Sequence, residues 1–261
     1  MWPALLPQPR TLQLPLHRGE IRWDATVAVA QAAQFAVWET QSANVLGASE
    51  IQALSALQFP RRRQSYLLGR VAAKAALLHG FKAADPREVE IRRGVFEQPV
   101  VYHPFRTPIS LSLTHTDRTA AAVVTAEEHP MGIDLEEVEI ARVEIIRTTL
   151  TAQERNHFPG TSAETLAEIT AAWTAKEALS KVLKCGMMTP MEILELATFR
   201  PLGPAVWEGT FSHFGQYRSY SWQVGDQVLS LVLPKNSTLA APADVTPWIQ
   251  LLSPLAETAG A

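Results

Sequence analysis

Two stretches of the chain resemble each other. Arg70–Gly80 and Trp173–Gly186 both have the pattern of a helix with cationic side chains that is closed by a glycine and followed by strands. A repeated helix-and-strand pattern predicts two units of the same type, because each unit must bury a hydrophobic face of its own. The sequence therefore predicts an α+β protein made of two similar halves that meet near residues 126–140.

The expected division of the chain follows from this repeat. We expect an N-terminal α+β half over residues 1–125 and a C-terminal α+β half over residues 126–240. The chain from residue 236 onward is rich in Ala, Pro, Ser and Thr and has a single apolar piece at 248–252. Residues 241–261 are therefore expected to form a loosely attached tail.

Composition excludes several classes of protein. Of the 261 residues, 47% are hydrophobic and 19% are charged, which is typical of a globular protein and not of a disordered one. The net charge of -3 argues against a dedicated nucleic-acid binder. Cys185 is the single cysteine, so an internal disulfide and a cysteine metal site are excluded. The expected protein is a cytoplasmic monomer without a membrane-spanning segment.

A helix with a basic face is predicted in the first half. It begins near Arg61 after Pro60 and ends at Gly80, a residue typical of the position just after a helix. Arginines at a helix N-terminus are unfavourable for the helix dipole, so their presence favours a bound anion such as phosphate over a purely solubilising role. The cationic side chains of this helix are Arg61, Arg62, Arg63, Arg70 and Lys74.

Two neighbouring strands in the middle of the chain carry polar side chains at informative places. Ile109–Thr114 alternates between apolar and hydroxyl residues, and His115 ends this strand on its apolar face. Residues 119–125 and 131–136 form a hairpin-like pair. On the second of these strands, Asp134 and Glu136 lie on the same face.

A long helix is predicted from the capping-box pair Thr161 and Glu164 to about Lys184. Glu177 and Lys181 lie one turn apart on one side of it. Lys176 falls within the apolar stripe, where it either extends past the edge of the core or meets a buried anion. The stripe consists of Leu166, Ile169, Trp173, Lys176, Ser180 and Leu183.

Packing this helix on the strand would bring three carboxylates and a lysine together. Asp134, Glu136 and Glu177 repel one another unless a cation lies between them, and ligation by oxygen alone suits Mg²⁺ or Mn²⁺. Taken singly, Asp134 and Glu136 fit a solvated strand face equally well, and Glu177 with Lys181 fits a surface ion pair. The combination of the strand, the histidine-ended strand before it and the helix after it favours the metal site.

These residues match a known family. Gly132-Ile-Asp-Leu-Glu136 followed by Trp173-Thr-Ala-Lys-Glu-Ala-Leu-Ser-Lys181 resembles the signature of the 4′-phosphopantetheinyl transferases, in particular their double-length, Sfp-type group. Ser112-Leu-Thr-His-Thr116 is similar to the Ser-His-Ser segment of that family, and 61–74 to its arginine-bearing helix. The resemblance covers residues 55–235.

The resemblance implies a fold and a set of site residues. The two halves would be related by a pseudo-twofold axis, with coenzyme A in the cleft between them. Asp134, Glu136 and Glu177 would hold Mg²⁺, with Mn²⁺ as an alternative. The implied catalytic residues are Glu177, Lys181 and Lys176. The implied coenzyme A ligands are Arg62, Arg63, Arg70, Lys74, Thr114, His115 and Lys181.

The chain departs from the family pattern in places. Glu97-Gln-Pro99 stands where Gly-Lys-Pro is frequent, so one phosphate contact is missing, and Arg92 or Arg93 is the expected substitute. Thr114 and Thr116 replace serines and keep the hydroxyl. Lys184 stands where a glycine is usual, so the turn after the helix is expected to differ.

The implied reaction transfers 4′-phosphopantetheine from coenzyme A to a serine of an apo acyl or peptidyl carrier protein. Such carriers serve fatty-acid, polyketide or nonribosomal-peptide biosynthesis. Nucleic acid and membranes are not expected partners. Two other interpretations stay open at this point. One is a binding module that holds coenzyme A or a carrier without transfer, and the other is a metal-dependent phosphodiesterase or nuclease.

Overall fold

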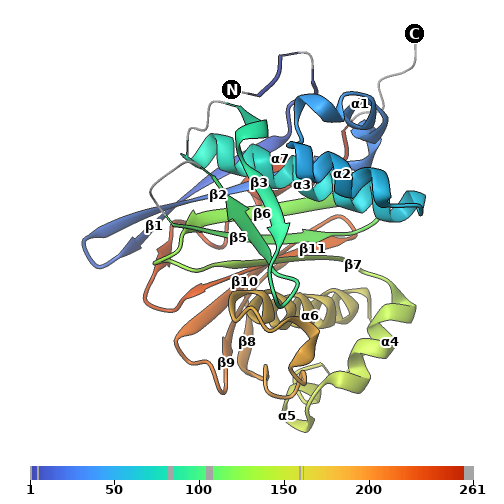
Figure 1. Cartoon of the computed structure of the whole chain (residues 1–261). Coiled ribbons are helices and arrows are strands. Elements are labelled where there is room, and N and C mark those ends of the chain that lie inside the picture. Colours follow the sequence, from blue (N-terminus) through green and yellow to red (C-terminus); the bar gives the residue numbers. More distant parts are fainter. Residues whose placement is uncertain are drawn as a thin grey trace.

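The protein is built in four layers, with two β-sheets packed face to face and helices on both outer sides (Figure 1). The computed structural model describes residues 2–255 except 5, 82–84, 104–107, 159 and 161. None of the described helices is both long enough and apolar enough to cross a bilayer. The predicted α+β class is confirmed, and both predicted long helices are present.

The first sheet is formed by the N-terminal half, with one short strand from the C-terminal part of the chain. Its neighbouring strands are antiparallel, and α3 (Pro60–Phe81) covers the outer face through contacts with β6 and β2. In spatial order the strands are β12 (Thr238–Leu239), β1 (Arg10–Arg18), β2 (Ile21–Gln31), β6 (Thr119–Ala126) and β5 (Ile109–His115).

The second sheet is formed by the C-terminal half. It too is antiparallel throughout, and α6 (Ala163–Val182) covers its outer face through contacts with β7, β11 and β10. The strands in spatial order are β7 (Gly132–Glu137), β11 (Gln227–Pro234), β10 (Tyr217–Val224), β9 (Val206–Phe211) and β8 (Leu196–Gly203).

Smaller elements flank each long helix. The N-terminal half adds α1 (Phe35–Thr40), α2 (Ala48–Ala56) and a two-stranded sheet of β3 (Glu90–Arg93) and β4 (Pro99–Tyr102). The C-terminal half adds α4 (Ile140–Thr149) and α5 (Ala152–Arg155), of which α4 contacts α6. Short 3-10 turns cover Ala32–Gln34, Ser42–Asn44, Pro86–Glu88 and Gly186–Met188.

The period-2 pattern of β7 decides which way its side chains face. Ile133 and Leu135 are buried in the core between the two sheets, together with Val27 and Val29 of β2. The alternate residues, Asp134 among them, therefore face α6 on the other side of the sheet. Separate clusters of buried apolar residues pack α3 and α6 onto their own sheets.

The expected loosely attached tail is wrong for residues 246–252. They form α7 (Thr246–Leu252), which packs against β1, β2 and β10. Trp248 and Leu251 are buried in the core between the sheets, and the Trp248 ring stacks on Trp222 with centroids 4.1 Å apart. The polar composition around this short helix concealed an apolar face that completes the central core. Residues 256–261 lie outside the described part of the chain.

Boundaries of the long helices differ slightly from expectation. The N-cap of α6 is Ser162, whose hydroxyl accepts a hydrogen bond from the Thr165 amide at 3.2 Å, and the expected cap Thr161 lies outside the described residues. Lys184 has a φ of 56°, so a lysine takes the left-handed conformation at the end of this helix. The turn therefore forms without the glycine that is usual there.

The two halves share their strand order beneath the long helix. In the first half β2, β6 and β5 lie side by side beside α3, and in the second β7, β11 and β10 lie side by side beside α6. A flanking pair follows in each case, β3 with β4 and β8 with β9. This correspondence supports the predicted pseudo-twofold relation and the predicted division near residues 126–140.

Candidate active site

Gly132 sets how closely β7 lies against α6. A Cβ atom at this position would stand 2.0 Å from the carbonyl oxygen of Ala178 in α6, which is far inside van der Waals contact. Only glycine lets the strand and the helix backbone approach to this extent. The glycine of the Gly-Ile-Asp motif therefore brings the next helix-facing residue, Asp134, within reach of the side chains of α6.

Asp134 is the centre of the site. Its Oδ1 accepts hydrogen bonds from Lys181 Nζ at 2.7 Å and from Thr114 Oγ1 at 2.9 Å. Lys181 Nζ also donates to the carbonyl oxygen of Ile133 at 3.1 Å. The second carboxylate oxygen, Asp134 Oδ2, is buried and has no hydrogen-bond partner. A buried carboxylate oxygen without a partner costs free energy unless a donor or cation satisfies it.

Glu136 and Glu177 are close enough to Asp134 to titrate abnormally. Burial raises the pKa of Glu136 from 4.5 to about 7, and the Asp134 charge adds to that rise. Burial and the Asp134 charge likewise raise the pKa of Glu177 to about 7. Arg142 of α4 pairs with Glu136 and, together with Lys181, opposes both shifts. The site therefore has an excess of negative charge that its own cations offset only in part.

These side chains fit a hard divalent cation in chemistry but are not arranged around one. Across the described residues, no three His, Cys, Asp or Glu side chains are positioned to hold a metal ion together. Glu136 is turned to Arg142, and Asp134 Oδ1 is taken by Lys181 and Thr114. The unpartnered Asp134 Oδ2 and the two carboxyl groups of raised pKa are nevertheless what a cation would satisfy. The predicted metal role of the three carboxylates stays a prediction.

The N-terminal half reaches this site through β5. Ser112 Oγ accepts a hydrogen bond from the Ile133 amide, and Thr114 Oγ1 accepts one from the Leu135 amide, each at 3.1 Å. Two hydroxyls of β5 thus replace backbone carbonyls as acceptors along one edge of β7. This hydroxyl seam joins the two sheets, and it places Thr114 against Asp134.

His115 lies at the exposed end of the same strand. The turn after it is held to the N-terminus of α3, because Asp117 accepts from Arg61 Nε at 2.7 Å and from Gln64 Nε2 at 2.8 Å through its backbone oxygen. Arg62, the next residue of α3, is exposed and has no ion pair among the described residues. His115 and Arg62 are therefore the two predicted phosphate ligands that remain accessible at this end of the molecule.

The coenzyme A role predicted for Lys74 is wrong. Its ammonium is fully buried and gives its three protons to Glu50 Oε2 at 2.6 Å, Pro86 O at 2.7 Å and Val89 O at 2.6 Å. An ammonium group has three donors, so none is left for a phosphate. Burial lowers the pKa of Lys74, and the Glu50 charge opposes that shift.

Arg63 and Arg70 also contact protein groups, although the buried Nε of Arg70 makes no hydrogen bond to any described residue. Arg63 pairs with Glu39 at 3.0 Å and donates to the Leu54 carbonyl oxygen at 2.9 Å. Arg70 lies 3.4 Å from Glu50 Oε1 with its guanidinium over the Tyr66 ring, and its side chain is 11% exposed. The predicted face of cations on α3 is thus mostly a packing surface, since the helix is buried along this side.

The catalytic role predicted for Lys176 is wrong as well. Its fully buried Nζ donates to both carboxylate oxygens of Glu154, at 3.0 and 2.9 Å. Glu154 Oε1 also accepts from the Leu196 amide at 2.9 Å, which ties α5, α6 and β8 together. Lys176 therefore meets a buried anion, as one of the two interpretations predicted. That anion is the Glu154 side chain of the protein itself.

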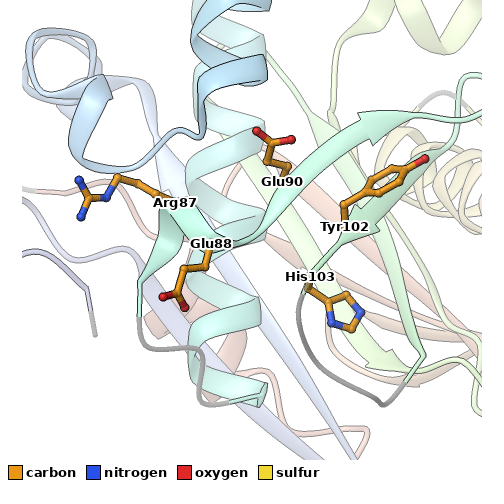
Figure 2. Close-up of a pocket in the computed structure, with 5 residues that line it drawn as sticks. All are labelled: Arg87, Glu88, Glu90, Tyr102 and His103. Carbon is orange, nitrogen blue, oxygen red and sulfur yellow. The ribbon is translucent and has the colours of Figure 1, made fainter.

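The expected substitutes for the missing lysine of the Gly-Lys-Pro segment are paired. Arg92 donates to Glu90 at 2.7 Å, and Arg93 pairs with Glu97 at 2.7 Å. The hollow at the far end of this two-stranded sheet has a volume of about 530 Å³ and is lined by Arg87, Glu88, Glu90, Tyr102 and His103 (Figure 2). None of the predicted site residues lines it.

Sequence reasoning missed Arg142. It lies on α4, the helix after β7, and pairs with Glu136 across the loop between them. The spacing in sequence gave no signal, because the pair depends on the angle at which α4 leaves the strand.

Comparison with known proteins bears on the same part of the chain. Residues 130–234 match the family model described as the 4′-phosphopantetheinyl transferase superfamily. The predicted resemblance to this superfamily is confirmed. The matched segment runs from the start of β7 through β11, so it contains every carboxylate of the site.

Relatives and solved structures were found as well. A holo-[acyl-carrier-protein] synthase from Exiguobacterium sibiricum is 37% identical over 78 residues, which are 28% of this chain and 61% of that protein. A holo-(acyl-carrier-protein) synthase from Bacillus anthracis, solved with CoA (3′,5′-ADP), aligns with 44% of this chain and 97% of its own at 16% identity and a TM-score of 0.37. The Thermotoga maritima enzyme aligns with 46% of this chain and 72% of its own at 24% identity and a TM-score of 0.32.

Proposed function

We propose that this protein transfers the 4′-phosphopantetheine group of coenzyme A to a serine hydroxyl of an apo carrier protein and releases adenosine 3′,5′-bisphosphate. The observation that carries the proposal is the cluster of buried Asp134 and Glu136 with half-buried Glu177 and Lys181, within the segment that matches the superfamily. The Exiguobacterium sibiricum relative is a holo-[acyl-carrier-protein] synthase, which supports a carrier as the acceptor.

The side chains divide into two groups by charge. Asp134, Glu136 and Glu177 would hold Mg²⁺, or Mn²⁺ in its place, on the pyrophosphate. A bound divalent cation supplies neutralisation of negative charge on the transferring and leaving phosphates. Lys181 holds Asp134 Oδ1 at 2.7 Å and adds positive charge at the same place. His115 and Arg62 would contact the remaining phosphates of coenzyme A.

In the transfer, the serine oxygen forms a bond to the phosphorus of the phosphopantetheine, and the bond from that phosphorus to the bridging oxygen of the pyrophosphate breaks. The serine proton must go to a base. Our candidate base is Glu177, because its carboxylate belongs to the cluster that would hold the cation beside the reacting phosphate. The pKa of Glu177 is about 7 in the protein alone, and a bound cation would lower it.

The double-length, Sfp-type arrangement is also part of this proposal. It is supported by the second α+β unit that precedes the matched segment and by the shared strand order of the two halves. Seryl acceptors on acyl or peptidyl carriers, a monomeric state and a cytoplasmic location belong to the same proposal. Nucleic acid and membranes are not proposed as partners.

The test is an intact-mass measurement on several apo carrier proteins after incubation with coenzyme A and Mg²⁺. We expect a mass gain equal to one phosphopantetheine group, and its loss when EDTA replaces Mg²⁺. Asp134→Asn should abolish the gain while its circular dichroism spectrum matches the wild type. Coenzyme A binding without any mass gain would favour a binding module, and hydrolysis of coenzyme A without a carrier would favour a phosphodiesterase.

A further inference from the structure

Thr114 is the point at which the N-terminal half touches the carboxylate cluster. Its side chain is buried, and its hydroxyl has two partners on β7. It accepts from the Leu135 amide at 3.1 Å and donates to Asp134 Oδ1 at 2.9 Å.

The direction of these bonds follows from the groups involved. A hydroxyl has one proton to donate, and a backbone amide can only donate. The Leu135 amide is therefore the donor of the first bond, and the proton of the Thr114 hydroxyl goes to Asp134 Oδ1. A phosphate oxygen of coenzyme A would also need that proton. Thr114 cannot donate to a phosphate while it holds Asp134.

The effect on Asp134 is to separate the roles of its two oxygens. Oδ1 already receives Thr114 and Lys181, at 2.9 and 2.7 Å, while the buried Oδ2 receives no hydrogen bond. Two donors on one oxygen hold the plane of the carboxylate. The other oxygen, Oδ2, is left with its lone pairs free.

We infer that Thr114 is a positioning residue for the divalent cation and not a ligand of coenzyme A: its hydroxyl fixes Asp134 so that Oδ2 is the oxygen presented to the cation. This inference rests on the proposed function. Hydrogen bonds that orient a metal-binding carboxylate are worth roughly 10-fold to 100-fold in metal affinity. Thr114 belongs to the N-terminal half and Asp134 to the C-terminal half. The cation site therefore depends on the hydroxyl contacts between β5 and β7.

The seam supplies a matched control. Ser112 lies two residues earlier on β5 and accepts from the Ile133 amide at 3.1 Å, as Thr114 does from Leu135, but contacts no carboxylate. Ser112→Ala and Thr114→Val both leave one amide of β7 without its acceptor. Only Thr114→Val also removes the hydroxyl from Asp134, and Thr114→Ser keeps it.

The experiment is a titration of the full-length protein with Mn²⁺, followed by electron paramagnetic resonance of the free ion, with and without coenzyme A. We expect Thr114→Val to raise the Mn²⁺ dissociation constant about 10-fold or more. Thr114→Ser and Ser112→Ala should bind Mn²⁺ as the wild type does. Both Ser112→Ala and Thr114→Val should lower the melting temperature. Coenzyme A affinity measured in EDTA should be the same in Thr114→Val and the wild type.

Several results would overturn the inference. These are unchanged Mn²⁺ affinity in Thr114→Val, equal weakening in Ser112→Ala, or a selective loss of coenzyme A affinity in EDTA. The absence of Mn²⁺ binding to the wild type in both conditions would overturn it as well. Failure of the proposed function looks different, because the wild type would then add no phosphopantetheine to any carrier.

Discussion

Each half of the molecule contains the same kind of buried glutamate–lysine ion pair. The two halves differ in the side chains where the long helix meets its neighbouring strand. Glu50 and Glu154 each occupy the third position of a short helix, pair with a fully buried lysine and accept a strand amide. The matching contacts are Gly47 N, Ile91 N and Lys74 on Glu50, and Thr151 N, Leu196 N and Lys176 on Glu154.

When the two halves are aligned on their buried lysines, the acidic residues of the site occur in the C-terminal half only. Lys74 is followed by Ala75, whereas Lys176 is followed by Glu177. The helix-facing positions of β2 include Ala28 and Ala30, which pack against α3 in an apolar cluster. The corresponding positions of β7, counted from the residue that lies closest to the helix, are Asp134 and Glu136.

This difference supports the proposal that the buried lysines stabilise the fold and that the carboxylates carry out the chemistry. A charged pair that occurs in both halves cannot by itself mark the reaction centre. What distinguishes the C-terminal half is a set of acidic residues at positions that are alanine in the other half. In our proposal the N-terminal half contributes Thr114, His115 and Arg62 to the site.

The largest expected effect on transfer is at Glu177, which corresponds to Ala75 in the other half. Glu177→Ala should lower transfer at least about 100-fold, because it removes the candidate base and one carboxylate of the cation site. The melting temperature should not fall, since a half-buried carboxyl group that repels Asp134 is lost. The matched control is Ala75→Ser in the other half, which should transfer as the wild type does. Near-normal turnover of Glu177→Ala in the mass assay would contradict the assignment.

Removing the lysine of either buried ion pair should have a large effect on stability. Lys176→Met leaves the buried Glu154 without its cation, at a cost of about 3–5 kcal/mol in the free energy of unfolding. Lys74→Met should cost somewhat less, because Arg70 remains 3.4 Å from Glu50. Urea unfolding measures this cost. Adding Glu50→Gln or Glu154→Gln to the matching lysine variant should recover part of it.

The lysine variants also show whether Lys176 acts in stability or in catalysis. Transfer by folded Lys176→Met should fall less than in Glu177→Ala, and the Lys176→Met, Glu154→Gln double variant should regain activity together with stability. A stable Lys176→Met protein without transfer would restore the catalytic role for this lysine and break the comparison.

A smaller difference is expected from the glycines where strand and helix meet. A Cβ at Gly132 would stand 2.0 Å from the Ala178 backbone oxygen, whereas one at Gly80 would stand 2.8 Å from the Thr26 side chain. Gly132→Ala should therefore cost about 1–3 kcal/mol through overpacking, and it should reduce transfer because β7 moves with Asp134. Gly80→Ala should cost less, since a side chain yields more readily than backbone and alanine favours the helix. Equal costs in thermal unfolding would contradict this explanation.

Much of this arrangement was visible in the sequence, and the parts that were not have a physical reason. The alternation in β7 and the helical spacing of Glu177 and Lys181 are local, so they predicted the carboxylate cluster with its lysine. Lys74 and Lys176 are buried because they pair with Glu50 of α2 and Glu154 of α5. A pair between distant segments leaves no periodic signal.

The pH dependence of stability tests the carboxylate cluster without changing its contacts. The pKa values of Glu136 and Glu177 rise from 4.5 to about 7 on folding, so the folded protein binds more protons than the unfolded chain between these values. The free energy of unfolding of the metal-free protein should then fall as the pH rises from about 5 to 8. Glu177→Gln should flatten this slope in thermal unfolding, and Mg²⁺ should do the same for the wild type. An identical slope in the variant would show that these carboxyl groups do not titrate as described.

The most direct test of a single centre in a two-half molecule is the Mn²⁺ stoichiometry in the presence of coenzyme A. Equilibrium binding followed by electron paramagnetic resonance should give one Mn²⁺ per chain, and Asp134→Asn should reduce it to none. Two ions per chain, or one ion that Asp134→Asn leaves in place, would contradict the assignment of the site to the carboxylates of the C-terminal half.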